Sequence, residues 1–400
     1  MQRQNFQRKK LKNGMTILFE KRENEIVSIA FAVRQGGINE KAEEKGISHF
    51  IEHMLYKGTK KRNSKQISAE IEKNGGVLNG FTDEELTAYW CKIPSKYIDV
   101  ALDVLGDMIK NPNFDEKEIE KERKVIFEEM KMYKDNPRLY VIENGLKKVL
   151  YEGDFSIPMI GTEVSMKKNN KKKMEELFKT IYSPENMILC IVGDADFNKI
   201  CEFAEKSFTG KGKNPAKIEM KKINKTIIEK KKGIDQANLI FSYHAPEASK
   251  KERHIAQVLS CIMIGGMSSR LFQEIREKRN LAYAVKGDYV GGKEYGYNFI
   301  FIGTSTENVE KVKELILSEF KKITNLTEKE LEEAKEQLIG NNKISREDSQ
   351  EQMVDLLSHE ISGKAEDSYE FEKEIRQVRL EDVKKLADFK TYSFFALLPE

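Results

Sequence analysis

The sequence predicts an α+β protein of two duplicated domains, each an antiparallel or mixed sheet covered by helices. Three observations lead to this prediction. The chain has 400 residues, a length that suits two domains of about 200 residues better than one. Hydrophobic residues make up 39% of it, which is enough to build two cores. A similar order of strand-like and helix-like segments also occurs in each half, which indicates a duplicated domain rather than a solenoid.

The strand-like segments recur in pairs. Residues 27–33 (VSIAFAV) alternate bulky and small side chains, as a half-buried strand does, and residues 234–243 (IDQANLIFSY) follow the same pattern. A second pair leads into helical patterns in both halves, and a third pair of apolar strands ends the two halves. These further segments are residues 87–94 with 297–305, and residues 186–193 with 393–399.

One pair of helical segments sets the register of the repeat. Residues 114–124 (FDEKEIEKERK) match residues 326–336 (LTEKELEEAKE) at an offset of 212. The stretch from 209 to 225 is basic and contains glycine and proline, as linkers often do. We therefore expect an N-terminal domain over 1–212, a linker over 213–225 and a C-terminal domain over 226–400.

Charge and composition disfavour several classes of protein. The 69 Lys and Arg nearly balance 66 Asp and Glu, and a net charge of +3 argues against a nucleic-acid binder. No stretch approaches 18 apolar residues, so we expect no membrane span. The polar, basic N-terminus does not have the pattern of a secretory signal. The four cysteines are scattered without a CxxC pair, which predicts reduced, buried thiols in a cytoplasmic protein.

The segment SHFIEHMLYKG, residues 48–58, places polar groups in an otherwise apolar stretch. Positions i, i+3 and i+4 share one face of a helix, so His49, Glu52 and His53 should point the same way. Two imidazoles at this spacing can bind one tetrahedral zinc ion, and a catalytic zinc needs a third protein ligand and an open position for water.

Residues 115–133 offer candidates for that third ligand. The apolar stripe of this helical pattern runs through Ile119 and Ile126, and it also contains Glu122 and Glu129. A carboxylate on a buried face is costly unless it is paired or bound to metal. Two such carboxylates one heptad apart predict one metal ligand and one supporting group.

The duplication provides a comparison within the chain. At the offset of 212, Glu122 aligns with Ala334 and Glu129 aligns with Asn341, and the segment RHIAQ (253–257) has no equivalent of the histidine motif. The fold is repeated but the polar cluster is not. This favours a chemical role for the cluster over a role in maintaining the fold. Two other interpretations stay open at this point: histidines that are merely hydrogen-bonded, and a purely structural zinc site.

The histidine motif and the two glutamates together resemble the signature of a known family. His-x-x-Glu-His is the inverzincin motif, and the chain resembles the insulinase/pitrilysin family over nearly its whole length, specifically the two-domain members related to the mitochondrial processing peptidase β subunit. In that family the third zinc ligand is a glutamate about 76 positions beyond the second histidine, and Glu129 stands 76 beyond His53. The family's accompanying glutamate lies seven positions earlier, at Glu122. The local sequence ERKVIFEE matches the family pattern ERxVIxEE.

Two further segments resemble the family. NGGVLNGFTDEELTAYW (74–90) is similar to the strand that pairs with substrate backbone beside the zinc, although Gly80 replaces the usual alanine, which we expect to loosen that edge. GGMSSRLFQEIREKRNLAYAV (265–285) is similar to the family's Arg/Tyr segment, with Arg276 and Tyr283 seven positions apart. Asn280 stands where glycine is common, and asparagine tolerates a left-handed backbone.

The resemblance implies a zinc metalloendopeptidase. Zn²⁺ would be held by His49, His53 and Glu129, with Glu52 as general base and Glu122 orienting a ligand histidine. Substrate would bind by strand addition along Asn79, Gly80, Phe81 and Thr82, while Tyr283 would stabilise the oxyanion and Arg276 would hold substrate backbone nearby. Because members of the family enclose their substrate in a chamber, peptides and unfolded polypeptide segments are the expected substrates. The alternative is a non-catalytic relative that serves as a recognition or core subunit.

The resemblance also implies an assembly. In larger relatives with four such domains, the first domain faces the fourth across the chamber. A two-domain chain can reproduce that arrangement by pairing head to tail in a two-fold homodimer. We therefore expect Arg276 and Tyr283 to act in trans, on the zinc site of the partner chain.

Overall fold

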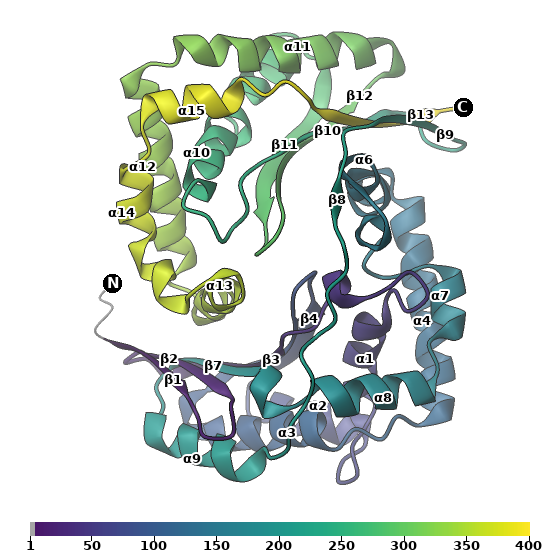
Figure 1. Cartoon of the computed structure of the whole chain (residues 1–400), viewed down its shortest axis with the longest axis vertical. Coiled ribbons are helices and arrows are strands. Elements are labelled where there is room, and N and C mark those ends of the chain that lie inside the picture. Colours follow the sequence, from purple (N-terminus) through teal and green to yellow (C-terminus); the bar gives the residue numbers. More distant parts are fainter. Residues whose placement is uncertain (1–4) are drawn as a thin grey trace. The chain divides into compact units, whose positions relative to one another are not determined.

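The computed structural model describes residues 5–400 (Figure 1). The first four residues of the expected N-terminal domain lie outside the described part. The chain divides into two compact units. The first comprises the residues up to Glu129, Pro158–Glu219 and Ile344–Tyr369, and the second comprises Met130–Ile157, Met220–Lys343 and Glu370–Glu400. Each unit therefore contains a segment from the other half of the sequence.

A six-stranded mixed sheet forms the centre of the first unit, with strand order β1-β2-β7-β3-β5-β4. Strands β2 and β7 are parallel, and the other neighbours are antiparallel. The strands are β1 (Phe6–Lys10), β2 (Thr16–Lys21), β3 (Ile26–Val33), β4 (Val77–Thr82), β5 (Thr87–Pro94) and β7 (Met187–Gly193). Strand β4 thus lies at an edge of this sheet and has one side free for pairing.

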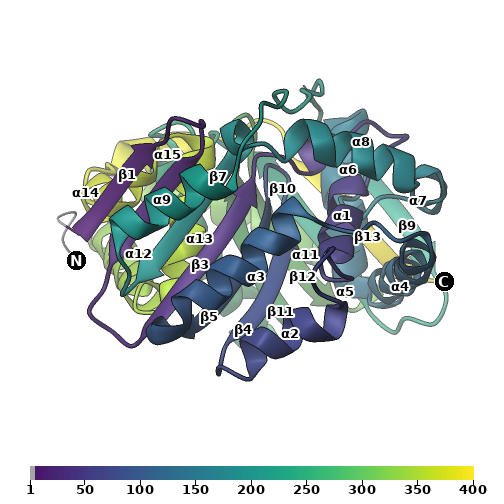
Figure 2. The ribbon, with the colours of Figure 1, turned by 90° about the horizontal axis from the view of Figure 1, so that it is seen from below.

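Helices cover both faces of this sheet (Figure 2). On one face α13 packs through Met353, Leu356 and Leu357 against small and branched side chains of the strands. The opposite face carries α1, α2 and α3. The helices of this unit are α1 (Ile47–Leu55), α2 (Ser64–Glu72), α3 (Ile98–Lys110), α7 (Glu163–Lys168), α8 (Lys171–Ile181), α9 (Phe197–Ser207) and α13 (Ser349–Ser362), together with most of α4 (Glu116–Asp135).

The second unit repeats this plan with a five-stranded mixed sheet of order β11-β12-β10-β13-β9. Its parallel pair is β13 with β9, in the place that β7 with β2 takes in the first sheet. The strands are β9 (Thr226–Lys231), β10 (Ala237–His244), β11 (Ala282–Gly291), β12 (Gly296–Thr304) and β13 (Ser393–Pro399). The predicted duplicated α+β fold with mixed sheets is therefore confirmed.

The helices of the second unit again lie on both faces of its sheet (Figure 1). The core on one face includes Leu239, Phe241, Val258, Ile316 and Phe394. On the other face, Ser393 of β13 donates a hydrogen bond to the carbonyl of Val149 in α6 at 2.9 Å. The helices are α5 (Pro137–Tyr140), α6 (Leu146–Leu150), α10 (Arg253–Ile264), α11 (Val309–Lys321), α12 (Glu328–Ser345), α14 (Phe371–Arg376) and α15 (Leu380–Ala387).

The expected linker has little regular structure. Residues 208–220 form neither helix nor strand, and β8 (Lys221–Lys222) then pairs with β6 (Tyr151–Glu152). The compact units divide the chain at other places than 212 and 226, because segments 130–157 and 344–369 each join the unit of the other half. The boundaries 1–212 and 226–400 remain a prediction about where the repeat begins and ends.

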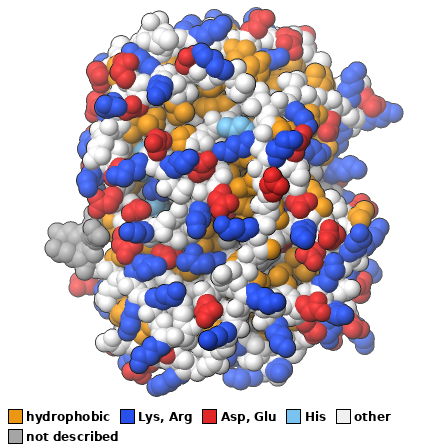
Figure 3. Space-filling model, in the orientation of Figure 1, with side chains coloured by type: hydrophobic (Ala, Val, Ile, Leu, Met, Phe, Trp, Pro, Cys, Tyr) orange, Lys and Arg blue, Asp and Glu red, His pale blue; other side chains and the backbone are white. Residues whose placement is uncertain are grey.

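The sequence predicts reduced, buried cysteines and no membrane-spanning segment. All four cysteines are free and buried, as predicted. No helix within residues 5–400 combines the length and the apolar character that a membrane span requires. Acidic and basic side chains are interspersed over the face seen in Figure 3.

Candidate metal centre

Helix α1 carries the histidine motif, and its start is fixed by a buried carboxylate. Gly46 precedes the helix with φ of 87°, a left-handed conformation that favours glycine. Glu40 accepts hydrogen bonds from the backbone N–H groups of Gly46 at 2.8 Å and Ser48 at 2.7 Å. A side-chain acceptor at this place satisfies donors that a helix leaves without partners, so α1 begins at a defined residue.

The helical spacing brings His49 and His53 together as predicted. Their ring centroids are 4.6 Å apart. The Nε2 atom of His49 lies 3.8 Å from Oε2 of Glu129, and Nε2 of His53 lies 3.9 Å from the same oxygen. Glu129 reaches them from α4, so two helices of the first unit supply the three groups. Within residues 5–400 they form the one set of three or more His, Cys, Asp or Glu side chains with metal-binding geometry.

The donor set fits a zinc ion. Two imidazole nitrogens and one carboxylate oxygen are ligands that zinc prefers at about 2.0–2.2 Å, which places them roughly 3.4 Å apart in a tetrahedron. The distances of 3.8 and 3.9 Å need only a small contraction to reach that value. Burial lowers the pKa of His49 to about 3, and the neighbouring His53 adds to the effect. The His49 ring is therefore neutral and has a lone pair available for a metal.

Glu122 holds the other side of the His53 ring. Its Oε2 lies 3.2 Å from Nδ1 of His53, and its Oε1 lies 2.7 Å from the ammonium of Lys57. Burial raises the pKa of the Glu122 carboxyl, but the hydrogen bonds from His53 and Lys57 outweigh it and leave this pKa below its ordinary value. An ionised Glu122 accepts the Nδ1–H of His53 and so directs the Nε2 lone pair toward Glu129.

Glu52 lies on the same face of α1 and is also restrained. Its Oε2 accepts a 2.6 Å hydrogen bond from the hydroxyl of Thr82. Burial raises the pKa of the Glu52 carboxyl, and the hydrogen bond from Thr82 offsets part of this effect. A carboxylate with a raised pKa beside a metal site is suited to accept a proton and pass it on.

The predicted substrate strand, Asn79 to Thr82, lies in β4 at the edge of the sheet. Its pairing with β5 runs without a shift from Val77–Lys92 to Thr82–Thr87. The ladder stays regular through Gly80, and the expectation that this glycine loosens the edge remains a prediction. Thr82 also has a contact that was not predicted: its hydroxyl donates a hydrogen bond to Glu52, and its backbone role in strand addition remains a prediction.

Arg276 and Tyr283 belong to the second unit, where they lie close together. The Arg276 guanidinium lies 5.9 Å from the centre of the Tyr283 ring, and Tyr283 is 78% exposed. Between them, Asn280 has φ of 51°, so the asparagine adopts the left-handed backbone that we expected there. Both functional groups are thus available at the surface of their unit.

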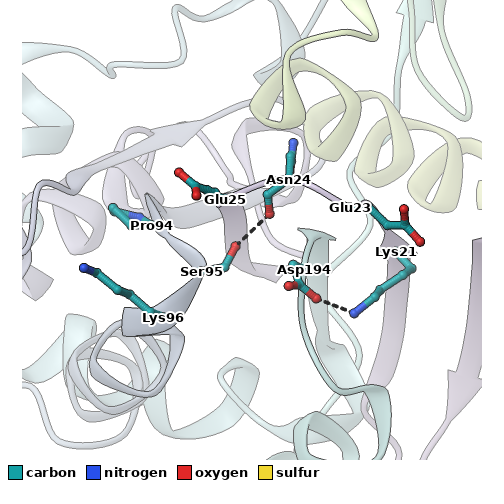
Figure 4. Close-up of a pocket in the computed structure, with 8 residues that line it drawn as sticks. All are labelled: Lys21, Glu23, Asn24, Glu25, Pro94, Ser95, Lys96 and Asp194. Atoms are coloured by element: carbon teal, nitrogen blue, oxygen red, sulfur yellow. Dashed lines mark hydrogen bonds and ion pairs between the residues drawn. The ribbon is translucent and has the colours of Figure 1, made fainter.

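A separate cavity of about 810 Å³ lies in the first unit at loops next to the sheet (Figure 4). Its lining includes Lys21, Asn24, Ser95 and Asp194, and Lys21 is paired with Asp194 across it. The cavity contains no histidine or cysteine and shares no residue with the metal centre. We therefore assign the chemistry to the metal centre.

Two residues of the centre were not predicted from the sequence. Lys57 contacts Glu122, and the spacing of four from His53 was a signal that could have indicated it. Tyr56 lies near Glu52 and Gly80, as described below. A lysine and a tyrosine at the end of a helix resemble ordinary surface and core residues, so neither stands out without the neighbouring strand and helix in view.

Comparisons with known proteins agree with this geometry. Residues 16–163 match the model of the family described as "Insulinase (Peptidase family M16)", and residues 169–338 match that of the "Peptidase M16 inactive domain". The chain is 33% identical over 384 residues to the "Uncharacterized zinc protease YmxG" of Bacillus subtilis, covering 94% of this chain and 93% of the relative. An "Uncharacterized zinc protease" of Rickettsia felis is 34% identical over 350 residues, covering 86% of this chain and 85% of the relative.

Solved structures share the fold. A protease from Helicobacter pylori has a TM-score of 0.92 at 21% identity, covering 98% of this chain and 99% of its own. A peptidase M16 inactive domain from Pseudomonas fluorescens has a TM-score of 0.88 at 19% identity, covering 99% of this chain and 98% of its own. With relatives above 30% identity along almost the whole length, the chain belongs to the insulinase family, peptidase family M16.

Proposed function

We propose that the chain is a zinc-dependent metalloendopeptidase that cleaves peptides or unfolded polypeptide segments. The observation that carries this proposal is the convergence of His49, His53 and Glu129 on one point, with the restrained carboxylate of Glu52 beside them. A purely structural zinc site would have a fourth Cys or His ligand. In place of such a ligand the site has Glu52, which is suited to act as a base.

The roles of the residues follow from this arrangement. Zinc held by His49, His53 and Glu129 would polarise the scissile carbonyl and lower the pKa of water toward about 7. Glu52 takes the proton of the attacking water and later delivers it to the leaving amine. Glu122 keeps His53 in the tautomer and orientation that leave Nε2 free.

The edge strand β4 supports the choice of substrate. An extended peptide that adds to this edge is bound mainly through its backbone, so many sequences can bind. Asn79, Gly80 and Phe81 provide that backbone at the strand that also carries Thr82, the partner of Glu52. Only an extended segment can pair in this way, which favours peptides and unfolded polypeptides over folded proteins.

We further propose a homodimer in which Arg276 and Tyr283 complete the zinc site of the partner chain. The support is that the metal ligands belong to the first unit, whereas the half-buried Arg276 and the exposed Tyr283 belong to the second. Tyr283 would donate a hydrogen bond to the developing oxyanion, and Arg276 would hold substrate backbone. We also infer a cytoplasmic location, which four free, buried thiols support.

A non-catalytic recognition or core subunit is the alternative function. One of the structural neighbours is described as a peptidase M16 inactive domain. The presence of His49, His53, Glu129 and Glu52 in one cluster favours the enzyme, because a non-catalytic subunit has no need of a base beside three metal ligands.

The experiment compares zinc content and cleavage of an unstructured fluorogenic peptide. Wild type should hold about one zinc per chain, and His53→Ala or Glu129→Gln should lose most of it. Glu52→Gln should keep its zinc yet cleave at least about 100-fold more slowly, the usual effect of losing a general base. Glu128→Gln, at the exposed neighbour of Glu129, is the matched control and should resemble wild type. Full zinc in both ligand variants, or wild-type cleavage by Glu52→Gln, would exclude this function.

A further inference from the structure

The space between strand β4 and helix α1 depends on the missing side chain of Gly80. A Cβ atom at this position would lie 2.6 Å from the hydroxyl oxygen of Tyr56 and 3.2 Å from Oε1 of Glu52. It would also lie 2.9 Å from the carbonyl oxygen of Ala88. The hydroxyl of Tyr56 and the free oxygen of Glu52 thus approach the same small space, which any larger residue at position 80 would fill.

The Tyr56 hydroxyl has no partner of its own in this space. Its oxygen is buried and makes no hydrogen bond within the described residues. A buried hydroxyl without a hydrogen bond is costly, so its partner should be a nearby acceptor or a bridging water. Burial and the nearby Glu52 carboxylate raise the pKa of Tyr56 well above its ordinary value. The hydroxyl therefore keeps its proton and is a donor.

The other hydroxyl groups around Glu52 are already engaged. Tyr89, whose ring centroid lies 6.2 Å from that of Tyr56, pairs its hydroxyl with that of Tyr182 at 2.8 Å. Thr82 donates to Oε2 of Glu52. Among these groups, Tyr56 is the one whose hydroxyl makes no hydrogen bond within the described residues and lies beside Oε1 of Glu52.

We infer that Tyr56 is a positioning residue that donates a hydrogen bond to Oε1 of Glu52 through one bridging water, across the space that Gly80 leaves open. This inference rests on the proposed function, since it concerns the residue proposed as the general base. Thr82 then holds one carboxylate oxygen and Tyr56 holds the other. Two fixed donors on opposite oxygens define the plane of the carboxylate, and the remaining lone pairs are free to accept a proton from water.

The matching of Tyr56 with Gly80 leads to a test by a double-mutant cycle. Tyr56→Phe removes the donor, so kcat should fall about tenfold while KM stays unchanged, because the hydroxyl is buried. Gly80→Ala should also lower kcat, since the new methyl group displaces the hydroxyl. In the double variant Tyr56→Phe/Gly80→Ala the methyl group no longer meets the hydroxyl and only its contact with the Ala88 carbonyl remains, so the two losses of kcat should combine to less than their product.

Controls separate this role from a structural one. Tyr182→Phe removes a tyrosine hydroxyl from the same aromatic cluster and should leave kcat close to wild type. Zinc content and melting temperature, measured for every variant, show whether a loss of kcat reflects a loss of metal or of fold. A wild-type kcat in Tyr56→Phe would overturn the inference, as would effects of the two single changes that multiply in the double variant.

The proposed function is tested separately within the same assay. If Glu52→Gln cleaves as fast as wild type, the general-base role fails and the inference fails with it. If Glu52→Gln is inactive but Tyr56→Phe is fully active, the proposed function stands and only the role of Tyr56 is wrong.

Discussion

His53 is restrained at both nitrogen atoms of its ring. Nε2 points toward Glu129, while Nδ1 meets Glu122, whose second oxygen is paired with Lys57. His49 differs, because its Nδ1 is buried without a hydrogen bond to the described residues. The orientation of one ligand histidine is therefore set by a relay of two further side chains, and that of the other is set by packing.

Lys57 and Glu122 should control how tightly the metal is held. Glu122→Gln removes the carboxylate that accepts the Nδ1–H of His53, and we expect zinc affinity to fall about 10- to 100-fold. Lys57→Met should weaken binding in the same direction but less, because Glu122 then keeps His53 and loses only its ammonium partner. Competition with a fluorescent chelator measures both affinities. Lys60→Met, at an exposed lysine three residues away, is the control and should bind zinc as wild type does. Equal zinc affinity in wild type and all three variants would show that Glu122 and Lys57 do not orient His53.

The meeting of His49, His53 and Glu129 could be predicted from helical spacing together with the family resemblance. His49 and His53 share a helical face, and Glu129 was identified by its place in an apolar stripe and by the family interval. The partners that hold the carboxylates of Glu122 and Glu52 could not be predicted in this way. Lys57 on Glu122, and Thr82 and Tyr56 around Glu52, depend on how α1, α4 and β4 pack, which local periodicity does not determine.

Helix α13 shows the same limit for a whole element. This helix was not predicted from the sequence, and nothing in residues 349–362 alone tells which sheet it covers. In the structure it packs on the first sheet, where Glu360 accepts hydrogen bonds from Arg8 at 2.8 and 2.9 Å and from Arg34 at 3.0 Å. Strands were easier to predict, because β3, β5, β7, β10, β12 and β13 lie within a few residues of their predicted ranges.

The segment that carries α13 should also make the first unit sensitive to acid. Burial raises the pKa of the Asp355 carboxyl, but hydrogen bonds from His359 and Ser368 and the charge of Arg346 outweigh it and hold this pKa at about 2. The ordinary value is 3.8. Because the folded-state pKa is the lower one, ionised Asp355 stabilises the fold above about pH 4, and this contribution is lost as the pH falls from about 4 to about 2.

The loss is measurable with the chain's single tryptophan. Trp90 is buried against α13, so its fluorescence during urea unfolding reports on the first unit. Between pH 7 and pH 3, wild type should lose about 1 kcal/mol more of its free energy of unfolding than Asp355→Asn does. Asp367→Asn, at an exposed position of the same segment, should follow wild type. An identical pH dependence in wild type and Asp355→Asn would show that Asp355 does not contribute.

Within residues 5–400, the candidate metal centre lies in one half of the duplicated fold. The two sheets share their strand order and the place of their parallel pair, yet Ala334 and Asn341 stand where the first half has Glu122 and Glu129. The second unit instead has the half-buried Arg276 beside the exposed Tyr283. Duplication has thus produced two similar scaffolds with different functional groups, and the proposed enzyme needs both.

Mixing two inactive variants tests whether these groups act in trans. If Tyr283 of the partner subunit completes each zinc site, a mixed dimer of Glu52→Gln and Tyr283→Phe chains has one site with both defects and one intact site. Random exchange of equal amounts should then restore about a quarter of wild-type activity, because half of the dimers are mixed and each has one of two sites. If the groups act within one chain, every site has one defect and the mixture stays as inactive as its parents. Native mass spectrometry verifies that mixed dimers have formed. Mixed dimers without recovered activity would show that each site is built within a single chain. A protein that stays monomeric would exclude the dimer itself.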